Sequence, residues 1–225
     1  MTERITAAEQ SKRSWLSTTL LGLVLAFLFI VPVLPVGTYK FIYNTLLTAI
    51  LIFAALAMDR ARKKAFVVAV VAIVIEWVAY FLDMPVILTL SQTVLFLYFI
   101  LIVIGMIIQI ATTKRVTPRV IVESITGYLL MGIVFSMIIM VVVRNAPGAY
   151  SLGGVAGSAG DQGWQLSESI YYGFITFTTL GYGDIVPLVP VSRSIAVLAS
   201  VTGQIYLTVI IAMLVGKFLS SRQER

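Results

Sequence analysis

Long apolar runs are the feature of this sequence that most constrains its fold. Six such runs follow one another along the chain, at residues 15–33, 41–58, 65–82, 86–111, 120–143 and 194–219. About 20 consecutive apolar residues form a helix that can cross a bilayer. Only 12% of the residues are charged, about half the share found in soluble domains. The sequence therefore predicts an all-α membrane protein with six transmembrane helices.

The lysines and arginines predict the orientation of these helices. With the N-terminus in the cytoplasm, thirteen of the 16 fall on the cytoplasmic side, and only Lys40, Arg144 and Arg193 fall outside. Cytoplasmic loops of membrane proteins are enriched in these residues. We therefore expect a multi-pass protein of the plasma (cell inner) membrane with both termini cytoplasmic. The net charge of +6 then reports topology, so the expected partner is the lipid bilayer and not nucleic acid.

The order of the runs predicts two domains. Residues 1–115 form a four-helix transmembrane domain, and residues 116–225 hold a helix, a polar loop, a short helix, a glycine-containing stretch and a last helix. Thr117 and Pro118 are a good N-cap and first residue for the fifth helix. The loop at 145–165 is rich in glycine, alanine and serine, which predicts a flexible extracellular segment.

Several kinds of chemistry are disfavoured by composition. The chain has no cysteine and no histidine, which excludes disulfides and histidine-based zinc or pH sensing. The spans lack clustered nucleophiles or acid–base pairs, so an enzyme is not expected. Few residues follow the last run, so we expect no soluble ligand domain there.

The stretch TTLGYGD at 178–184 follows a predicted helix, 166–177, that is too short to cross the membrane. Non-helical backbone at membrane depth is tolerated only where it is buried in protein or lines water. Gly181 and Gly183 can adopt positive φ, and alternating backbone handedness turns successive carbonyls toward one side. Four such strands around an axis would form rings of oxygens that suit a dehydrated cation about the size of K+. Thr179 would add a hydroxyl at the inner end.

The side chains around this stretch have expected places. Tyr182 would point away from the axis and pack against Tyr171 and Tyr172 of the short helix. Asp184 would lie at the outer mouth and hydrogen-bond back to that helix. The C-terminus of the short helix carries partial negative charge, which favours a cation nearby.

TTLGYGD resembles the selectivity-filter signature of tetrameric potassium channels, with Leu180 where valine is commonest. The resemblance extends over residues 123–219 and includes the Ile-Val-Pro at 185–187 and Arg193. It implies a pore domain at 116–225 with an outer helix, a re-entrant pore helix, a filter loop and an inner helix. It also implies a homotetramer, each chain with three identical partners around a central pore, that conducts K+ passively. The residues implied are, for the K+ sites, Thr179, Leu180, Gly181, Tyr182 and Gly183, and for filter support Thr178, Asp184, Tyr171 and Tyr172.

The last helix leaves alternatives open. Gly203 lies where the family often has a hinge glycine, but a glycine can equally serve close helix packing. Gln204, Leu207 and Ile211 share one helical face, which by resemblance lines the inner cavity and otherwise contacts a neighbouring helix. Ile175 stands where some family members carry a carboxylate behind the filter, so an acid-stabilised filter is not expected.

The first four helices occupy the position of a voltage sensor. The fourth, at 91–111, has no charged residue, so we expect no voltage gating of the usual kind. Glu76, inside the third helix, is expected as a protonated or hydrogen-bonded carboxyl that faces the helix bundle, with a sensor or lipid role as the alternative. Glu123 is one turn from Arg119, which predicts an ion pair.

Other functions remain open at this stage. A non-selective cation channel of the same architecture is the main alternative, although loss of the filter tyrosine tends to mark such relatives and Tyr182 is present. A secondary transporter or a membrane scaffold would also have six helices, but transporters often have broken helices in both halves.

Overall fold

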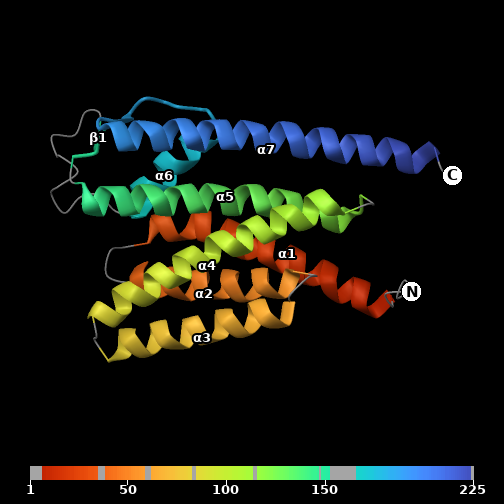
Figure 1. Ribbon diagram of the computed structural model, residues 1–225, viewed down its shortest axis with the longest axis horizontal. Helices are drawn as coiled ribbons and strands as arrows, with labels where there is room; N and C mark the ends of the chain where they lie inside the picture. The colour runs from red at the N-terminus through yellow and green to blue at the C-terminus, as the bar shows by residue number, and fades with distance from the viewer. Residues whose placement is uncertain are drawn as a thin grey trace. The chain divides into compact units, whose positions relative to one another are not determined.

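The computed structural model describes residues 7–34, 39–58, 62–82, 85–113, 116–146, 148–152 and 166–223. This part of the chain is all-α apart from two three-residue strands (Figure 1). Its elements, in chain order, are α1 (Ala7–Ile30), the 3-10 helix η1 (Val31–Val33), α2 (Tyr39–Ala57), α3 (Arg62–Phe81), α4 (Pro85–Thr112), α5 (Pro118–Asn145), β1 (Tyr150–Leu152), α6 (Leu166–Phe177), β2 (Ile185–Pro187) and α7 (Pro190–Gln223). Every predicted apolar run lies on a helix. Some residues that entered the prediction of orientation and of a flexible loop fall outside the described residues, namely Arg4, Arg60, Lys114, Arg115, Arg225 and most of 145–165.

Among the described residues, four helices are long and apolar enough to cross a membrane, over Arg13–Val33, Leu90–Thr112, Pro118–Asn145 and Pro190–Lys217. The chain is therefore a multi-pass membrane protein. In the described part of α2 and α3, the apolar stretches are shorter, at Phe41–Ala57 and Phe66–Val78. The predicted count of six spans stays a prediction.

The chain forms two compact units whose limits differ from the predicted boundary at residue 115. Unit 1 comprises residues 1–27, 35–127 and 216–225, and unit 2 comprises residues 28–34 and 128–215. The difference arises because α5 and α7 are long, at 28 and 34 residues. The first turns of α5 and the last turns of α7 pack with unit 1, whereas the rest of both helices packs within unit 2.

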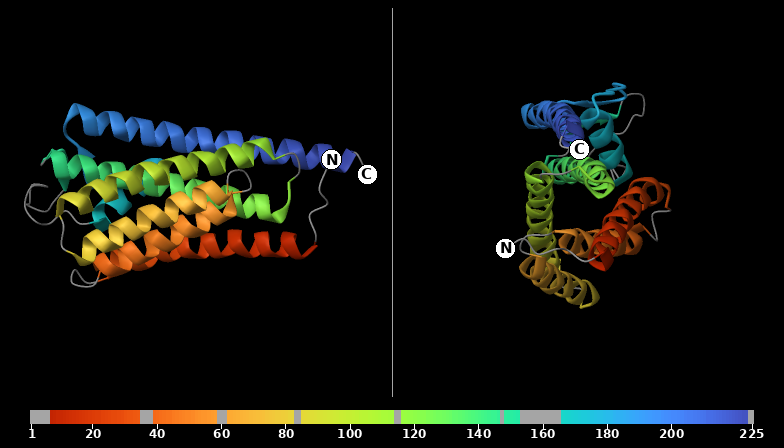
Figure 2. Two further views of the ribbon diagram at one scale, coloured as in Figure 1. Left: turned by 60° about the horizontal axis from the view of Figure 1, so that its bottom comes forward. Right: turned by 90° about the vertical axis from the view of Figure 1, so that its right-hand side faces the viewer.

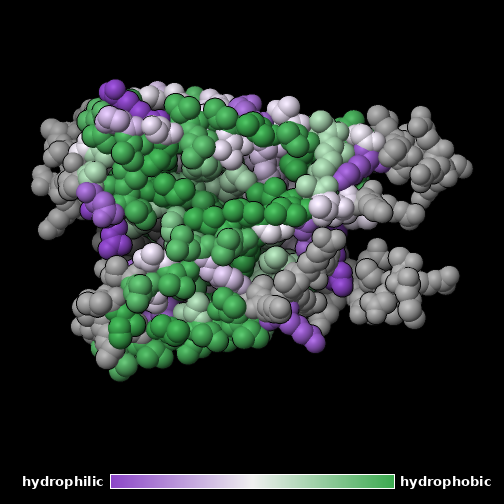
Figure 3. Space-filling view, viewed as in Figure 1, coloured by the Kyte–Doolittle hydropathy of each residue, from purple (hydrophilic) through white to green (hydrophobic). Residues whose placement is uncertain are grey.

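Unit 1 is held together by apolar faces of its helices. In α2, α3 and α4, which lie side by side (Figures 1 and 2), residues such as Ala54, Ala72 and Phe99 are buried. Alanines at these faces let helices approach closely, as is common in membrane proteins. The opposite faces remain apolar, with Val67, Val71 and other large side chains exposed. Apolar residues cover most of the visible surface along the helices, and hydrophilic residues gather toward helix ends (Figure 3).

Polar contacts join separate helices of unit 1. Arg119 Nε lies 2.7 Å from Glu123 Oε1, so the predicted pair is confirmed. The same oxygen accepts a hydrogen bond from Ser17 Oγ of α1 at 2.8 Å, and Glu123 is only 4% exposed. Lys217 Nζ, near the end of α7, donates to the carbonyl oxygens of Ala111 at 3.1 Å and Thr113 at 2.5 Å.

Two sequence expectations, one about the start of α5 and one about Glu76 inside α3, can be compared with the structure. Val120 N donates to Thr117 Oγ1 at 3.4 Å, which fits the predicted N-cap before Pro118. Glu76 is 6% exposed, so its carboxyl faces the interior of unit 1 as expected. Its protonation state and its role stay predictions.

Unit 2 packs α6 between α5 and α7. The ring of Phe177 lies 4.8 Å from that of Tyr128 and 5.7 Å from that of Phe135, both on α5. Tyr128 also contacts Tyr206 of α7, with ring centroids 5.6 Å apart. This aromatic cluster holds the C-terminal end of α6 in place.

Candidate ion pathway

The short helix α6 is fixed against α5 by two close approaches. A Cβ on Gly132 of α5 would meet the ring of Phe174, and a Cβ on Gly173 of α6 would meet Ser136, whose Cα lies 3.0 Å away. At both positions, a side chain would collide with the neighbouring helix. At 12 residues, α6 is about 18 Å long, too short for a hydrocarbon core of about 30 Å.

The end of α6 is fixed by hydrogen bonds to its last carbonyls. Thr178 donates to Phe174 O from both its backbone N, at 2.9 Å, and its Oγ1, at 2.7 Å. Thr179 N donates to Thr176 O, and Gly181 N donates to Ile175 O, both at 3.0 Å. These bonds satisfy carbonyls that have no partner within the helix. They also fix the direction in which the chain leaves α6.

The backbone after α6 alternates in handedness. Positive φ occurs at Thr179 (62°), Gly181 (56°) and Gly183 (80°). The prediction of positive φ at the two glycines is confirmed. A Cβ at either glycine would meet nothing within 4 Å, so conformation and not space requires glycine there. Threonine rarely adopts this conformation, and strained residues of this kind cluster at functional sites.

The stretch from Thr178 to Asp184 is exposed along its whole length. Leu180 is 56% exposed and Tyr182 is 68% exposed. The segment leaves α6 and runs back along α7 to the point where that helix begins (Figure 1). The chain by itself therefore leaves an extended, glycine-containing segment uncovered.

The outer end of the stretch is tied back to α6. Tyr171 Oη donates to Asp184 Oδ2 at 2.5 Å, and Ile185 N donates to Asp184 Oδ1 at 3.0 Å. The predicted hydrogen bond from Asp184 to the short helix is thereby confirmed. The hydrogen bond to the Asp184 carboxylate raises the pKa of the Tyr171 phenol to about 12. The phenol therefore keeps, near neutral pH, the proton that the bond needs.

The two tyrosines of α6 face different surroundings, which corrects one expectation. Tyr172 is 4% exposed, and its ring packs edge to face on Tyr150, with centroids 5.1 Å apart. Consecutive helical residues point about 100° apart, so Tyr172 faces the core of unit 2 when Tyr171 faces Asp184. The expected packing of Tyr182 against Tyr172 is therefore not present within the chain.

A small sheet that the sequence did not indicate anchors the segment after the stretch. β1 and β2 pair antiparallel, with Ser151 opposite Val186. Ser192 Oγ, buried at the start of α7, donates to Ala149 O at 2.8 Å, and Leu188 N donates to the same oxygen at 2.9 Å. The start of α7 is thereby fixed to the loop after α5.

The inner end of the stretch contacts one face of α7. Ser200 Oγ donates to Thr176 O at 3.1 Å, and Gln204 Nε2 donates to Thr179 Oγ1 at 2.9 Å. Between them, Gly203 is buried, and a Cβ there would overlap the carbonyl oxygen of Phe177. Spacings of three and four put these α7 residues on one face, a pattern from which Ser200 could have been found.

The residues predicted to line the cavity differ in their exposure and contacts. Gln204 and Ile211 are exposed and Leu207 is half-buried, and of these Gln204 reaches the stretch. Gly203 packs closely on α6, and α7 is continuous through it. Close packing, one of the two interpretations of Gly203, is therefore supported. A hinge function stays a prediction.

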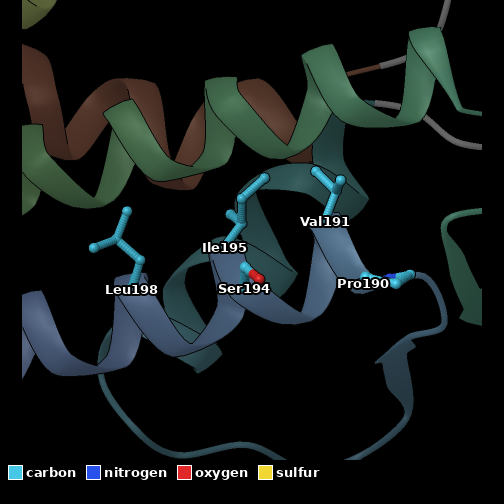
Figure 4. Close-up of a pocket in the computed structure, with 5 residues that line it drawn as sticks. All are labelled: Pro190, Val191, Ser194, Ile195 and Leu198. Atoms are coloured by element: carbon cyan, nitrogen blue, oxygen red, sulfur yellow. The ribbon is translucent and has the colours of Figure 1, made fainter.

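A shallow hollow of about 310 Å³ lies on the first turns of α7, away from these contacts. It is lined by Pro190, Val191, Ser194, Ile195 and Leu198, which all come from one helix (Figure 4). The lining is apolar apart from one hydroxyl and holds no charged group. It is not the candidate ion pathway.

Comparison with known proteins agrees with this geometry. No curated protein and no solved structure matches the chain. A family model described as an ion channel matches residues 137–220, which include most of the C-terminal half of α5, all of α6, the glycine stretch and most of α7. The match is to a channel family and not to an enzyme family. Residues 137–220 are therefore similar to an ion channel domain.

Proposed function

We propose that the protein is a potassium-selective channel that conducts K+ passively through a filter formed by residues 179–183 of four copies. The observation that carries the proposal is the alternation of positive φ at Thr179, Gly181 and Gly183, directly after a half-helix. Alternating handedness directs successive backbone carbonyls toward one side. Rings of such carbonyls can replace the hydration shell of K+. The K+ ligands would be the carbonyls of Thr179, Leu180, Gly181 and Tyr182, with the Thr179 hydroxyl.

Exposure of the stretch supports a tetramer. Non-helical backbone at membrane depth must be covered by protein or line water, and residues 178–184 are exposed in the single chain. α7 also presents large apolar side chains, such as Val197, Val201 and Ile205. Four copies around one axis would cover these surfaces and leave only the carbonyl side open. Tyr182, which has no ring of its own chain to pack on among the described aromatic pairs, would then contact a neighbouring copy.

Membrane topology completes the proposal. α2 and α3, with 19 and 20 residues, are about 28–30 Å long, close to the thickness of the hydrocarbon core. Six spans with both termini in the cytoplasm agree with the distribution of lysine and arginine. α4 carries no charged residue, so its movement through the field would transfer no charge, and opening would not depend steeply on voltage.

The test is planar-bilayer recording of the purified protein with KCl on one side and NaCl on the other. A tenfold permeability ratio shifts the reversal potential by about 59 mV, and we expect a shift well beyond that in favour of K+. Native mass spectrometry in lipid should give four copies per particle. A reversal potential near zero would instead support a non-selective cation channel. A particle that contains a single copy would contradict a filter formed by four copies.

A further inference from the structure

A polar side chain of α7 lies at the inner end of the proposed filter. Gln204 Nε2 donates to Thr179 Oγ1 at 2.9 Å, a normal length for an N–H···O hydrogen bond. Both residues are exposed in the single chain, on the side that the chain itself leaves open. We propose that Gln204 is a positioning residue that orients the Thr179 hydroxyl and thereby sets cation affinity at the innermost site. The proposal rests on the proposed function of this segment as a filter.

The position of Gln204 relative to the filter is fixed by its neighbours on α7. One turn earlier, Ser200 Oγ donates to Thr176 O at 3.1 Å. Gly203 is in close contact with the Phe177 carbonyl. These two contacts prevent α7 from sliding or rotating against the end of α6. The amide of Gln204 is therefore presented to Thr179 by a fixed backbone.

The oxygen atom of Thr179 is also held in one place. Its backbone has φ 62°, and its N donates to Thr176 O at 3.0 Å. Threonine is β-branched, so its χ1 rotation is restricted. What remains free is rotation of the hydroxyl hydrogen about the Cβ–Oγ1 bond.

The hydrogen bond from Gln204 restricts that rotation. A threonine hydroxyl has one hydrogen and two lone pairs. The amide N–H of Gln204 occupies one lone pair of Thr179 Oγ1 and excludes the hydroxyl hydrogen from that direction. The hydroxyl therefore has fewer orientations, and its second lone pair is held ready for a cation. A preorganised oxygen binds a charge more strongly than one that must reorient when the charge arrives. Four such pairs would surround the axis in the tetramer.

The test is block by Ba2+ added to the cytoplasmic side of single channels, since Ba2+ is a divalent cation close to K+ in size. We expect Gln204→Leu to raise the dissociation constant of internal Ba2+ by at least about threefold, because one lost hydrogen bond corresponds to a factor of this order. The control is Thr208→Val, which makes the same polar-to-apolar change at an exposed residue one turn further along α7. It should leave block unchanged. A merely structural role would change the number of active channels but not the affinity within one channel.

Gln204→Glu keeps the length of the side chain and covers the case in which the leucine variant does not assemble. The carboxylate accepts the hydroxyl hydrogen instead of donating and adds negative charge near the site. Block should therefore tighten. Block equal to wild type in either variant overturns the inference, provided that the wild type is potassium-selective. A wild type without K+ selectivity overturns the proposed function instead, so the two failures are distinguishable.

Discussion

Replacing Gly203 with alanine would place a methyl group where α7 already touches the end of α6. A Cβ at this position overlaps the Phe177 carbonyl oxygen and lies 3.1 Å from the carbonyl carbon, whereas Cβ atoms essentially never come within 3.0 Å of another heavy atom. The obstacle is backbone and cannot swing aside, so α6 and α7 must separate by about 1 Å to restore normal contact. Overpacking of this kind costs about 1–3 kcal/mol, and the rigid obstacle places Gly203→Ala near the upper end.

Thermal unfolding of the purified protein in detergent measures this cost. For a chain of this size, about 3 kcal/mol corresponds to a fall in Tm of roughly 6–12 °C. The matched control is Gly216→Ala on the same helix, where a Cβ meets nothing within 4 Å, and alanine there should be neutral or slightly stabilising. An unchanged Tm for Gly203→Ala would refute the packing argument. If that variant also opened less often, the hinge interpretation of Gly203 would be favoured.

Three further perturbations follow from the described contacts. Gly181→Ala forces an L-residue to φ 56° at a cost of about 1–2 kcal/mol, so reversal-potential measurements should show reduced K+ selectivity; Gly148→Ala, at φ 84° outside the pathway, should retain it. The pKa of Tyr171 is raised to about 12 by its hydrogen bond to Asp184. The stability that this bond contributes is therefore complete below pH 10 and is lost as pH rises through about 12. Sustained current should decline over this alkaline range in wild type but show no such step in Tyr171→Phe. Arg119→Gln leaves the buried Glu123 carboxylate without its cation, which should destabilise the protein by about 3–5 kcal/mol in thermal unfolding.

Local sequence signals predicted the helices and the positive φ of the two glycines in the stretch at 178–184. Apolar runs of sufficient length have few alternatives to a helix in a bilayer, and Gly181 and Gly183 were expected at positive φ because that conformation is open to glycine. Asp184 was expected to bond to the short helix, and the two lie close together in the sequence. Each of these inferences depends on neighbouring residues or on one element.

Features that depend on tertiary packing were not predictable. β1 is three residues long, and its partner β2 lies beyond α6, so no local pattern indicates a strand at Tyr150. The ring of Tyr172 packs on that tyrosine and not on Tyr182. The contact between Gln204 and Thr179 depends on how α7 crosses the end of α6, which the residues between them do not specify.

The two hydrogen bonds from Lys217 have a mechanical consequence for the C-terminal end of α7. A lysine near a helix end is suited to cap carbonyls that lack partners. Here the acceptors lie at the end of another helix, α4, with Ala111 in its last turn and Thr113 directly after it. Any splaying of the end of α7 away from α4 stretches both bonds at once, so this single ammonium acts as a latch that resists the movement. Lys217→Met removes the latch and keeps the length of the side chain, and a stimulus that shifts α4 would then no longer be transmitted to α7 through this link.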